Sequence, residues 1–173
     1  NIAATFKSAE VAKVLLENGA DVNKMGRWGY GPLYESALGN SAELAKVLIE
    51  NGADLNKTSK YRQTPLHECA SRNSTDVAKT LIENGAEVDK MNGDGKTPLH
   101  TAAWMGNVDV AKVLIENGAE VDRQDEYGNT PLHECTSMVR AAQAKYNTAT
   151  FESADVAKTL IENGAEVDKL NEY

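Results

Sequence analysis

Two four-residue strings decide the fold of this chain. Thr97-Pro98-Leu99-His100 is repeated from Thr64 and from Thr130, so its copies begin 33 residues apart. Glu116-Asn117-Gly118-Ala119 has further copies that begin at Glu17, Glu50, Glu83 and Glu162, with intervals of 33, 33, 33 and 46 residues. Because both strings keep one register, the chain consists of internal repeats of about 33 residues. This periodicity predicts an array of stacked units.

Each unit contains the signals for two helices and a turn. Thr is a good helix N-cap and Pro suits the first helical position, so a helix is expected to start after each Thr-Pro. Apolar residues such as Val110, Val113 and Leu114 have the spacing of a second helix. Acidic residues open these second helices, where the helix dipole favours them: Glu10, Glu43, Asp76, Asp109 and Asp155. The Gly of Asn-Gly-Ala fits a left-handed helix stop, and a hairpin-like turn is expected from Asp89 to Lys96.

This pattern closely resembles the ankyrin repeat family over nearly the whole chain. The resemblance implies an all-α solenoid of helix-turn-helix units with projecting hairpin loops. It also implies a non-enzymatic protein-protein interaction scaffold that holds its partner on a concave surface. Since one repeat cannot bury its own apolar face, the core is expected to form between neighbouring units.

We expect one ankyrin-repeat domain over residues 1–173. Its units are 1–25 (partial), 26–58, 59–91, 92–124 and 125–170, and the last has an insertion near 139–151. The insertion is either a tolerated surface loop or a binding loop. Phe6 and Phe151 lie in nearly identical segments, so we expect them to have the same role. No polar capping repeat is evident, which predicts continuation of the natural protein at both ends or end-to-end stacking of exposed apolar ends.

Two units depart from the pattern. The unit 26–58 has Gly31 and Tyr34 where other units have Thr and His, so its first helix is expected to be less well capped. The unit 59–91 has Arg62 where the hairpin usually has Gly, which leaves the geometry of that turn open.

Composition narrows the function. The net charge of −8 argues against nucleic acid, because binding to phosphates depends on Lys and Arg. No apolar run is long enough for a membrane helix, so membrane insertion is not expected. Two cysteines, Cys69 and Cys135, do not make a disulfide framework, which favours an intracellular, cytoplasmic setting.

No catalytic, metal or cofactor site is predicted. His67, His100 and His133 recur at the repeat interval, which places them in different layers and favours structural hydrogen bonds. Cys69 and Cys135 occupy the small-residue position of Ala102, which favours buried spacers. The resemblance also marks Asn23 and Asn56 as candidate substrates of an asparaginyl hydroxylase, and the alternative for both is a structural role in a turn.

The expected partner-binding surface joins the hairpin tips to the exposed ends of the first helices. We carry the binding positions of the family over onto this chain, residue by residue. Unlike the scaffold positions, they vary strongly between units. They include both tryptophans, and tryptophan is a residue type that is enriched at interfaces. They are Arg27, Trp28, Tyr30, Leu38, Lys60, Tyr61, Gln63, Arg72, Asp94, Lys96, Trp104, Met105, Glu126, Tyr127, Asn129 and Met138.

Two other functions remain open at this point. The chain could be the recruitment segment of a larger enzyme or channel whose active domain lies outside it. It could also be part of a structural array that supports other domains. All three interpretations share the ankyrin scaffold. A recruitment segment would still bind or orient a partner, whereas a supporting array is favoured by many more repeats without a variable aromatic surface.

Overall fold

The computed structural model describes residues 9–136 and 152–169, and the secondary structure assigned there consists of helices and turns without strands. This confirms the all-α prediction. Residues 131–136 are also helical, and the remaining helices are α2 (Ala9–Glu17), α3 (Pro32–Leu38), α4 (Ala42–Glu50), α5 (Pro65–Arg72), α6 (Thr75–Glu83), α7 (Pro98–Met105), α8 (Val108–Glu116) and α10 (Glu152–Glu162).

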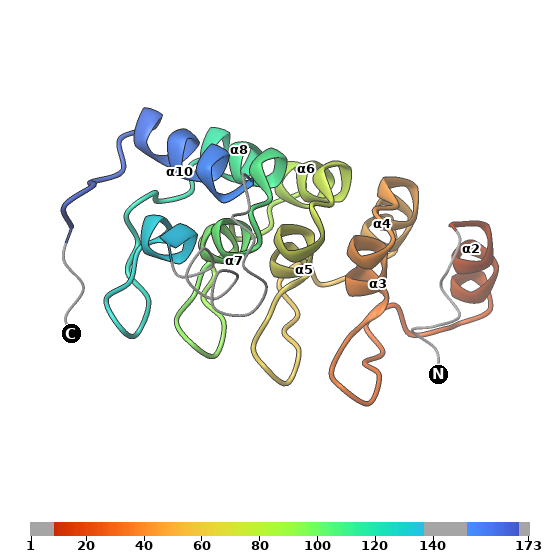
Figure 1. Ribbon diagram of the computed structural model, residues 1–173. Coiled ribbons are helices and arrows are strands. Elements are labelled where there is room, and N and C mark those ends of the chain that lie inside the picture. Colours follow the sequence, from red (N-terminus) through yellow and green to blue (C-terminus); the bar gives the residue numbers. More distant parts are fainter. Residues whose placement is uncertain (1–8, 137–151, 170–173) are drawn as a thin grey trace, which may run out of the picture.

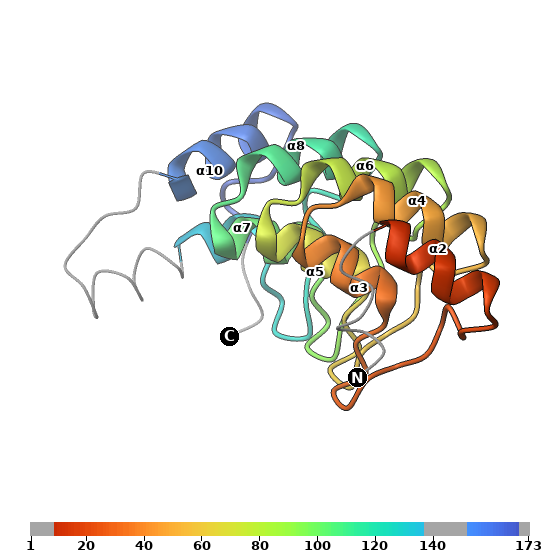
Figure 2. The same ribbon diagram turned by 90° about the vertical axis from the view of Figure 1, so that its right-hand side faces the viewer.

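The helices form two layers. The second helices α2, α4, α6, α8 and α10 lie side by side in one row, and the first helices α3, α5 and α7 with residues 131–136 lie in the other (Figures 1 and 2). Hairpin-like loops project from the first-helix layer, all toward the same side (Figure 1). The predicted solenoid of stacked helix pairs is therefore confirmed.

The core lies between the layers and continues from unit to unit. Leu48, Leu81 and Leu114 are spaced by the repeat and fully buried. The first described layer differs, because Val11 is 43% exposed whereas Leu44, which occupies the equivalent position in the next unit, is 2% exposed. An apolar end face is thus present at α2, and end-to-end stacking stays a prediction.

Local signals position the helices as predicted. The Thr64 and Thr97 hydroxyls accept the backbone N–H of His67 and His100, and each histidine side chain completes a capping box. Gly31 offers no side chain to cap α3, in agreement with the weaker cap expected there.

The turn at Arg62 keeps the geometry of its neighbours. Arg62 has φ 59°, close to the values of Gly29, Gly95 and Gly128 at the equivalent positions. A non-glycine residue in this left-handed region carries some strain, so the repeat imposes the turn on Arg62. The predicted insertion near 139–151, and the comparison of Phe6 with Phe151, lie outside the described residues.

Candidate protein-interaction surface

The four described hairpins form a row, and backbone hydrogen bonds join the first three. Each is closed at its base by a backbone hydrogen bond of 2.8–2.9 Å, for example from the Asn92 N–H to the Lys96 carbonyl. Neighbouring hairpins are joined as well: the Lys60 N–H donates to the Trp28 carbonyl at 3.4 Å, and the Gly93 N–H donates to the Tyr61 carbonyl at 3.1 Å. These bonds hold the tips of the first three hairpins at fixed spacing, and each of the four hairpins keeps its own closed turn.

One tip position is aromatic in three of the four hairpins. Trp28, Tyr61 and Tyr127 are 54%, 59% and 55% exposed, and Asp94 occupies the same position in the remaining hairpin. Two cations contact the ring of Trp28: the Arg27 guanidinium lies 5.6 Å and the Lys60 ammonium 5.9 Å from the ring centroid. Large exposed aromatic side chains at regular spacing are typical of binding surfaces.

A groove of about 360 Å³ lies between the hairpins and the first helices of the middle units. We call it the central groove. Six of the residues predicted from sequence line it: Tyr30, Gln63, Asp94, Lys96, Trp104 and Met105. They come from three hairpins and from the end of α7, so the stacking of units brings them together.

The other predicted residues lie outside the central groove. Leu38 and Arg72 are exposed at the ends of α3 and α5, and Asn129 is half-buried at the base of its hairpin. Arg27, Trp28, Lys60, Tyr61, Glu126 and Tyr127 are exposed on the hairpin tips. Met138 lies outside the described residues.

Two buried carboxylates shape the groove region, and the sequence analysis missed both. Glu68 accepts the Tyr34 hydroxyl at 2.7 Å and the Arg72 Nε at 3.0 Å. Glu134 pairs with the Lys96 ammonium at 2.9 Å, while its second oxygen has no hydrogen-bond partner among the described residues. The available signal was the repeated His-Glu-Cys string, because the unit between has Thr101 at the position of these glutamates.

The family comparison agrees with this geometry. A model of ankyrin repeats in three copies matches residues 1–92 and again residues 85–171. The chain belongs to the ankyrin repeat family. Ankyrin repeats are generally protein-protein interaction modules, and the family is typically non-catalytic. No curated protein matches the sequence.

Two of the three histidines of this ankyrin array are hydrogen-bonded on both sides of the ring. His67 Nδ1 lies 2.8 Å from the Thr64 hydroxyl, and Nε2 lies 3.0 Å from the Lys96 carbonyl of the next unit. His100 makes the same contacts with Thr97 and with the Asn129 carbonyl. The predicted structural hydrogen bonds are confirmed for these two residues, and they also tie consecutive units together, which the sequence analysis did not foresee.

Burial holds these side chains in their neutral forms. It lowers the pKa of His67 to about 4 and also lowers that of His100, although the backbone carbonyls oppose the change. Burial raises the pKa of the Cys69 thiol and raises that of Cys135 to about 12. Both cysteines are buried and protonated near neutral pH, as expected for small spacers; a reactive thiol would need the thiolate.

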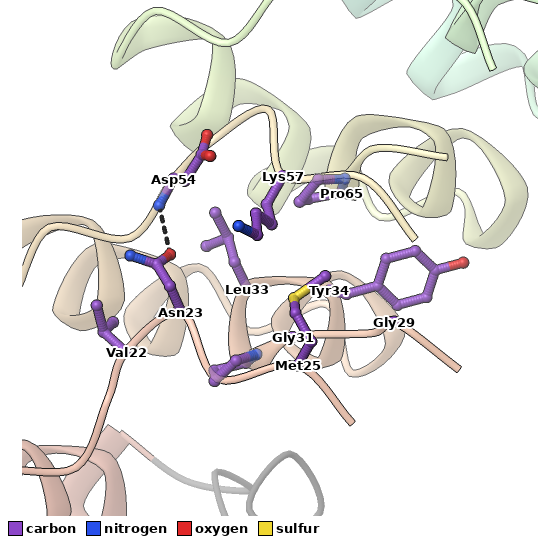
Figure 3. Close-up of a pocket in the computed structure, with 11 residues that line it drawn as sticks. Val22, Asn23, Met25, Gly29, Gly31, Leu33, Tyr34, Asp54, Lys57 and Pro65 are labelled. Carbon is purple, nitrogen blue, oxygen red and sulfur yellow. Dashed lines mark hydrogen bonds between the residues drawn. The ribbon is translucent and has the colours of Figure 1, made fainter. Parts of the chain in front are cut away.

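The two candidate asparagines for hydroxylation hold loops together. Asn23 Oδ1 accepts the Asp54 N–H at 2.8 Å (Figure 3). Asn23 Nδ2 donates to the Gly52 carbonyl at 3.1 Å. Asn56 Oδ1 accepts the Glu87 N–H at 3.0 Å in the same way. These bonds support the structural alternative, and hydroxylation stays a prediction.

The cavity beside Asn23 is too small for an organic ligand. It is lined by Val22, Met25, Leu33 and neighbouring residues (Figure 3). Its volume is about 10 Å³, which is about the space that one water molecule requires. No helix in the described part of the chain is long and apolar enough to span a membrane. Within residues 9–136 and 152–169, no three His, Cys, Asp or Glu side chains gather at one point where they could hold a metal ion.

Proposed function

We propose that this ankyrin array holds a partner protein on the surface formed by its hairpin tips and the central groove. The observation that carries the proposal is the gathering of six variable residues from three hairpins and one helix into the central groove. Scaffold positions repeat almost unchanged, whereas these positions differ from unit to unit. Variation confined to one surface is what partner recognition on a repeated scaffold requires.

The chemistry of the surface fits a protein partner. Trp104 and Met105 offer apolar area at the end of α7, and both are partly exposed. Lys96 lies 5.8 Å from the Trp104 ring centroid, and its ion pair with Glu134 fixes the ammonium group there. An apolar anchor bordered by oriented polar groups is the arrangement found at interface hot spots. Leu38, Arg72, Glu126, Tyr127 and Asn129 would form the rim of this surface.

The test uses peptide ligands selected from a random display library against the immobilised chain. Affinities are then measured by fluorescence anisotropy for the chain and for Trp104→Ala. We expect a loss of about 2 kcal/mol, or about 30-fold, because truncation of a tryptophan anchor has an effect of this size. The matched control is Ile161→Ala, since Ile161 is a partly exposed apolar residue on α10 in the other helix layer.

Circular dichroism establishes that each variant is folded. Retention of affinity within about two-fold by Trp104→Ala would contradict the central groove as the binding surface, because a hot-spot residue cannot be removed at so small a cost. An equal loss in Ile161→Ala would also contradict it, since the effect would then not depend on the groove.

A further inference from the structure

The four described hairpins differ in charge along the array. Residues 21–30 contain two basic residues and one acidic residue, and residues 54–63 contain three basic and one acidic. Residues 87–96 contain two basic and three acidic residues, and residues 120–129 contain one basic and four acidic. We call residues 21–30 and 54–63 the basic hairpins and residues 87–96 and 120–129 the acidic hairpins. A chain with 26 acidic and 18 basic residues thus concentrates positive charge at one end of its hairpin row.

The cations of the two groups are also used differently. In the acidic hairpins, Lys90 pairs with Glu87 at 2.9 Å, Lys96 with Glu134 at 2.9 Å, and Arg123 with Glu120 at 3.1 Å. In the basic hairpins, none of the five cations forms an ion pair within the described ranges 9–136 and 152–169: Lys24, Arg27, Lys57, Lys60 and Arg62. These cations therefore keep their full charge for a partner.

One substitution in the repeat explains part of this difference. Glu87 and Glu120 each reach the basic residue three positions later. The equivalent residues in the basic hairpins are Asp21 and Asp54, whose shorter side chains accept the N–H of Asn23 and Asn56 at 2.9 Å instead. Lys24 and Lys57 are left without the acidic partner that Lys90 and Arg123 have.

The free cations surround exposed aromatic side chains. Arg27 and Lys60 contact the Trp28 ring, and Tyr61 lies between Lys60 and Arg62 in the sequence and is likewise exposed. Clustering like charges raises the free energy of the folded chain, because the cations outnumber the acidic residues there and repel one another. An anionic partner would remove this repulsion, and the rings supply apolar contact beside the charges.

We propose that the basic hairpins bind an acidic, carboxylate-rich segment of the partner protein, with Trp28 and Tyr61 as its apolar contacts. This inference rests on the proposed function and names the chemistry of the partner. Positive charge at the basic hairpins and negative charge at the acidic hairpins would also fix the direction in which the partner segment lies along the row. Complementary charge sets orientation and association rate in this way.

The experiment compares an acidic peptide obtained in the display selection with an analogue in which every Asp and Glu is replaced by Asn and Gln. We expect the analogue to bind at least about 10-fold more weakly, and the affinity of the acidic peptide to fall at least about 10-fold between about 50 and 500 mM salt, because exposed charges are screened. Equal binding of the two peptides, or a selection without enrichment of acidic residues, would overturn the inference.

Variants of the protein show whether the basic hairpins are the site that binds the acidic peptide. The double variant Arg27→Glu, Lys60→Glu should weaken binding of the acidic peptide at least about 10-fold. The matched control Lys79→Glu, Lys112→Glu makes the same change in net charge on exposed lysines of α6 and α8, and it should keep the affinity within about two-fold. Equal losses in both double variants would overturn the inference, because the effect would then come from net charge alone.

Two further measurements distinguish an acidic protein segment from other molecules that could bind the basic hairpins. Tighter binding of a single-stranded RNA oligonucleotide than of the acidic peptide, lost in Arg27→Glu, Lys60→Glu, would overturn the inference in favour of nucleic acid. Self-association of the chain in sedimentation, lost in the same variant, would overturn it in favour of a second copy. Loss of peptide binding in Trp104→Ala without any effect of the charge variants would leave the proposed function standing and reject only the acidic segment.

Discussion

The first helices α3 and α7 are both tied to the following unit, but by different side chains. In α7, Thr97 caps the helix and His100 joins it to the next unit through the Asn129 carbonyl at 3.0 Å. In α3, Gly31 gives no side-chain cap, and the Tyr34 hydroxyl reaches Glu68 of the next unit at 2.7 Å. The two helices differ in sequence at the most recognisable motif of the repeat, yet both are linked to the following unit by a side-chain hydrogen bond.

The difference teaches which part of the motif is essential. A link to the following unit is kept at both sites, whereas the identity of the linking atoms and the side-chain cap are not. The replacement has a consequence for the surface, because Tyr34 stacks on Tyr30 with ring centroids 4.2 Å apart and lines the central groove. The less regular unit thus contributes an aromatic pair to the groove where its neighbours have histidine.

The largest expected effect comes from removing the histidine link. His100→Ala should lower the free energy of unfolding by about 4 kcal/mol, because it opens a cavity, removes the link to the Asn129 carbonyl and takes away the acceptor of the buried Thr97 N–H. Tyr34→Phe removes only a hydroxyl and leaves Glu68 paired with Arg72, so about 1 kcal/mol is expected there. Urea denaturation followed by circular dichroism measures both, and equal losses would contradict the distinction between the two helices.

The next effect is the pH dependence that histidine brings and tyrosine does not. The pKa of His67 falls from 6.5 to about 4 on folding, so the folded state binds fewer protons than the unfolded state between these values. The contribution of neutral His67 to the free energy of unfolding is therefore fully present above pH 6.5 and is lost as the pH falls toward 4. The total loss from this residue is on the order of 3 kcal/mol.

Nuclear magnetic resonance titration of the His67 ring, combined with urea denaturation between pH 7.5 and 4.5, checks the pH prediction. The ring should remain neutral at pH 5.5, where an ordinary histidine is mostly protonated. Tyr34 adds no titration in this window, because burial beside Glu68 raises its pKa. A His67 pKa near 6.5 would contradict the explanation.

The smallest effect concerns the caps themselves. Gly31→Ser should stabilise the chain by a few tenths of a kcal/mol, because serine caps helices slightly better than glycine and Gly31 has an ordinary extended backbone. The added Cβ would meet only the Met25 sulfur, at 3.0 Å, which can move. The reciprocal Thr97→Gly should cost about 1 kcal/mol, since Thr97 also contacts the His100 ring. Thermal unfolding of the pair measures the difference, and a loss of stability in Gly31→Ser would show that Met25 cannot adjust.

The sequence predicted the fold because its signals act within one unit. Thr97, Pro98 and the left-handed Gly118 determine the ends of helices from neighbouring residues alone, and the repeat interval then makes every unit alike. Arg62 was the informative exception. The sequence left its turn open, and the structure shows that Arg62 adopts the left-handed conformation of the glycines in the neighbouring hairpins.

The candidate site was predictable only as a set of positions. Variation between units selected Tyr30, Asp94 and Trp104, but no local signal states that they line one groove. The buried carboxylates of Glu68 and Glu134 escaped sequence analysis because most glutamates in this chain repeat with the scaffold and are exposed. Their burial depends on side chains from neighbouring units, as the contacts of Tyr34 and Lys96 show.

The sequence by itself thus determined the helices, their ends, the order of the units and the positions free to vary, since these depend on propensity, capping and hydrophobic spacing within about 33 residues. Only the tertiary structure decided which distant side chains meet: the link from Tyr34 to Glu68, the central groove and the cations left without an acidic partner. The physical reason is that these features depend on distances of a few ångströms between units, and packing sets those distances when the units stack.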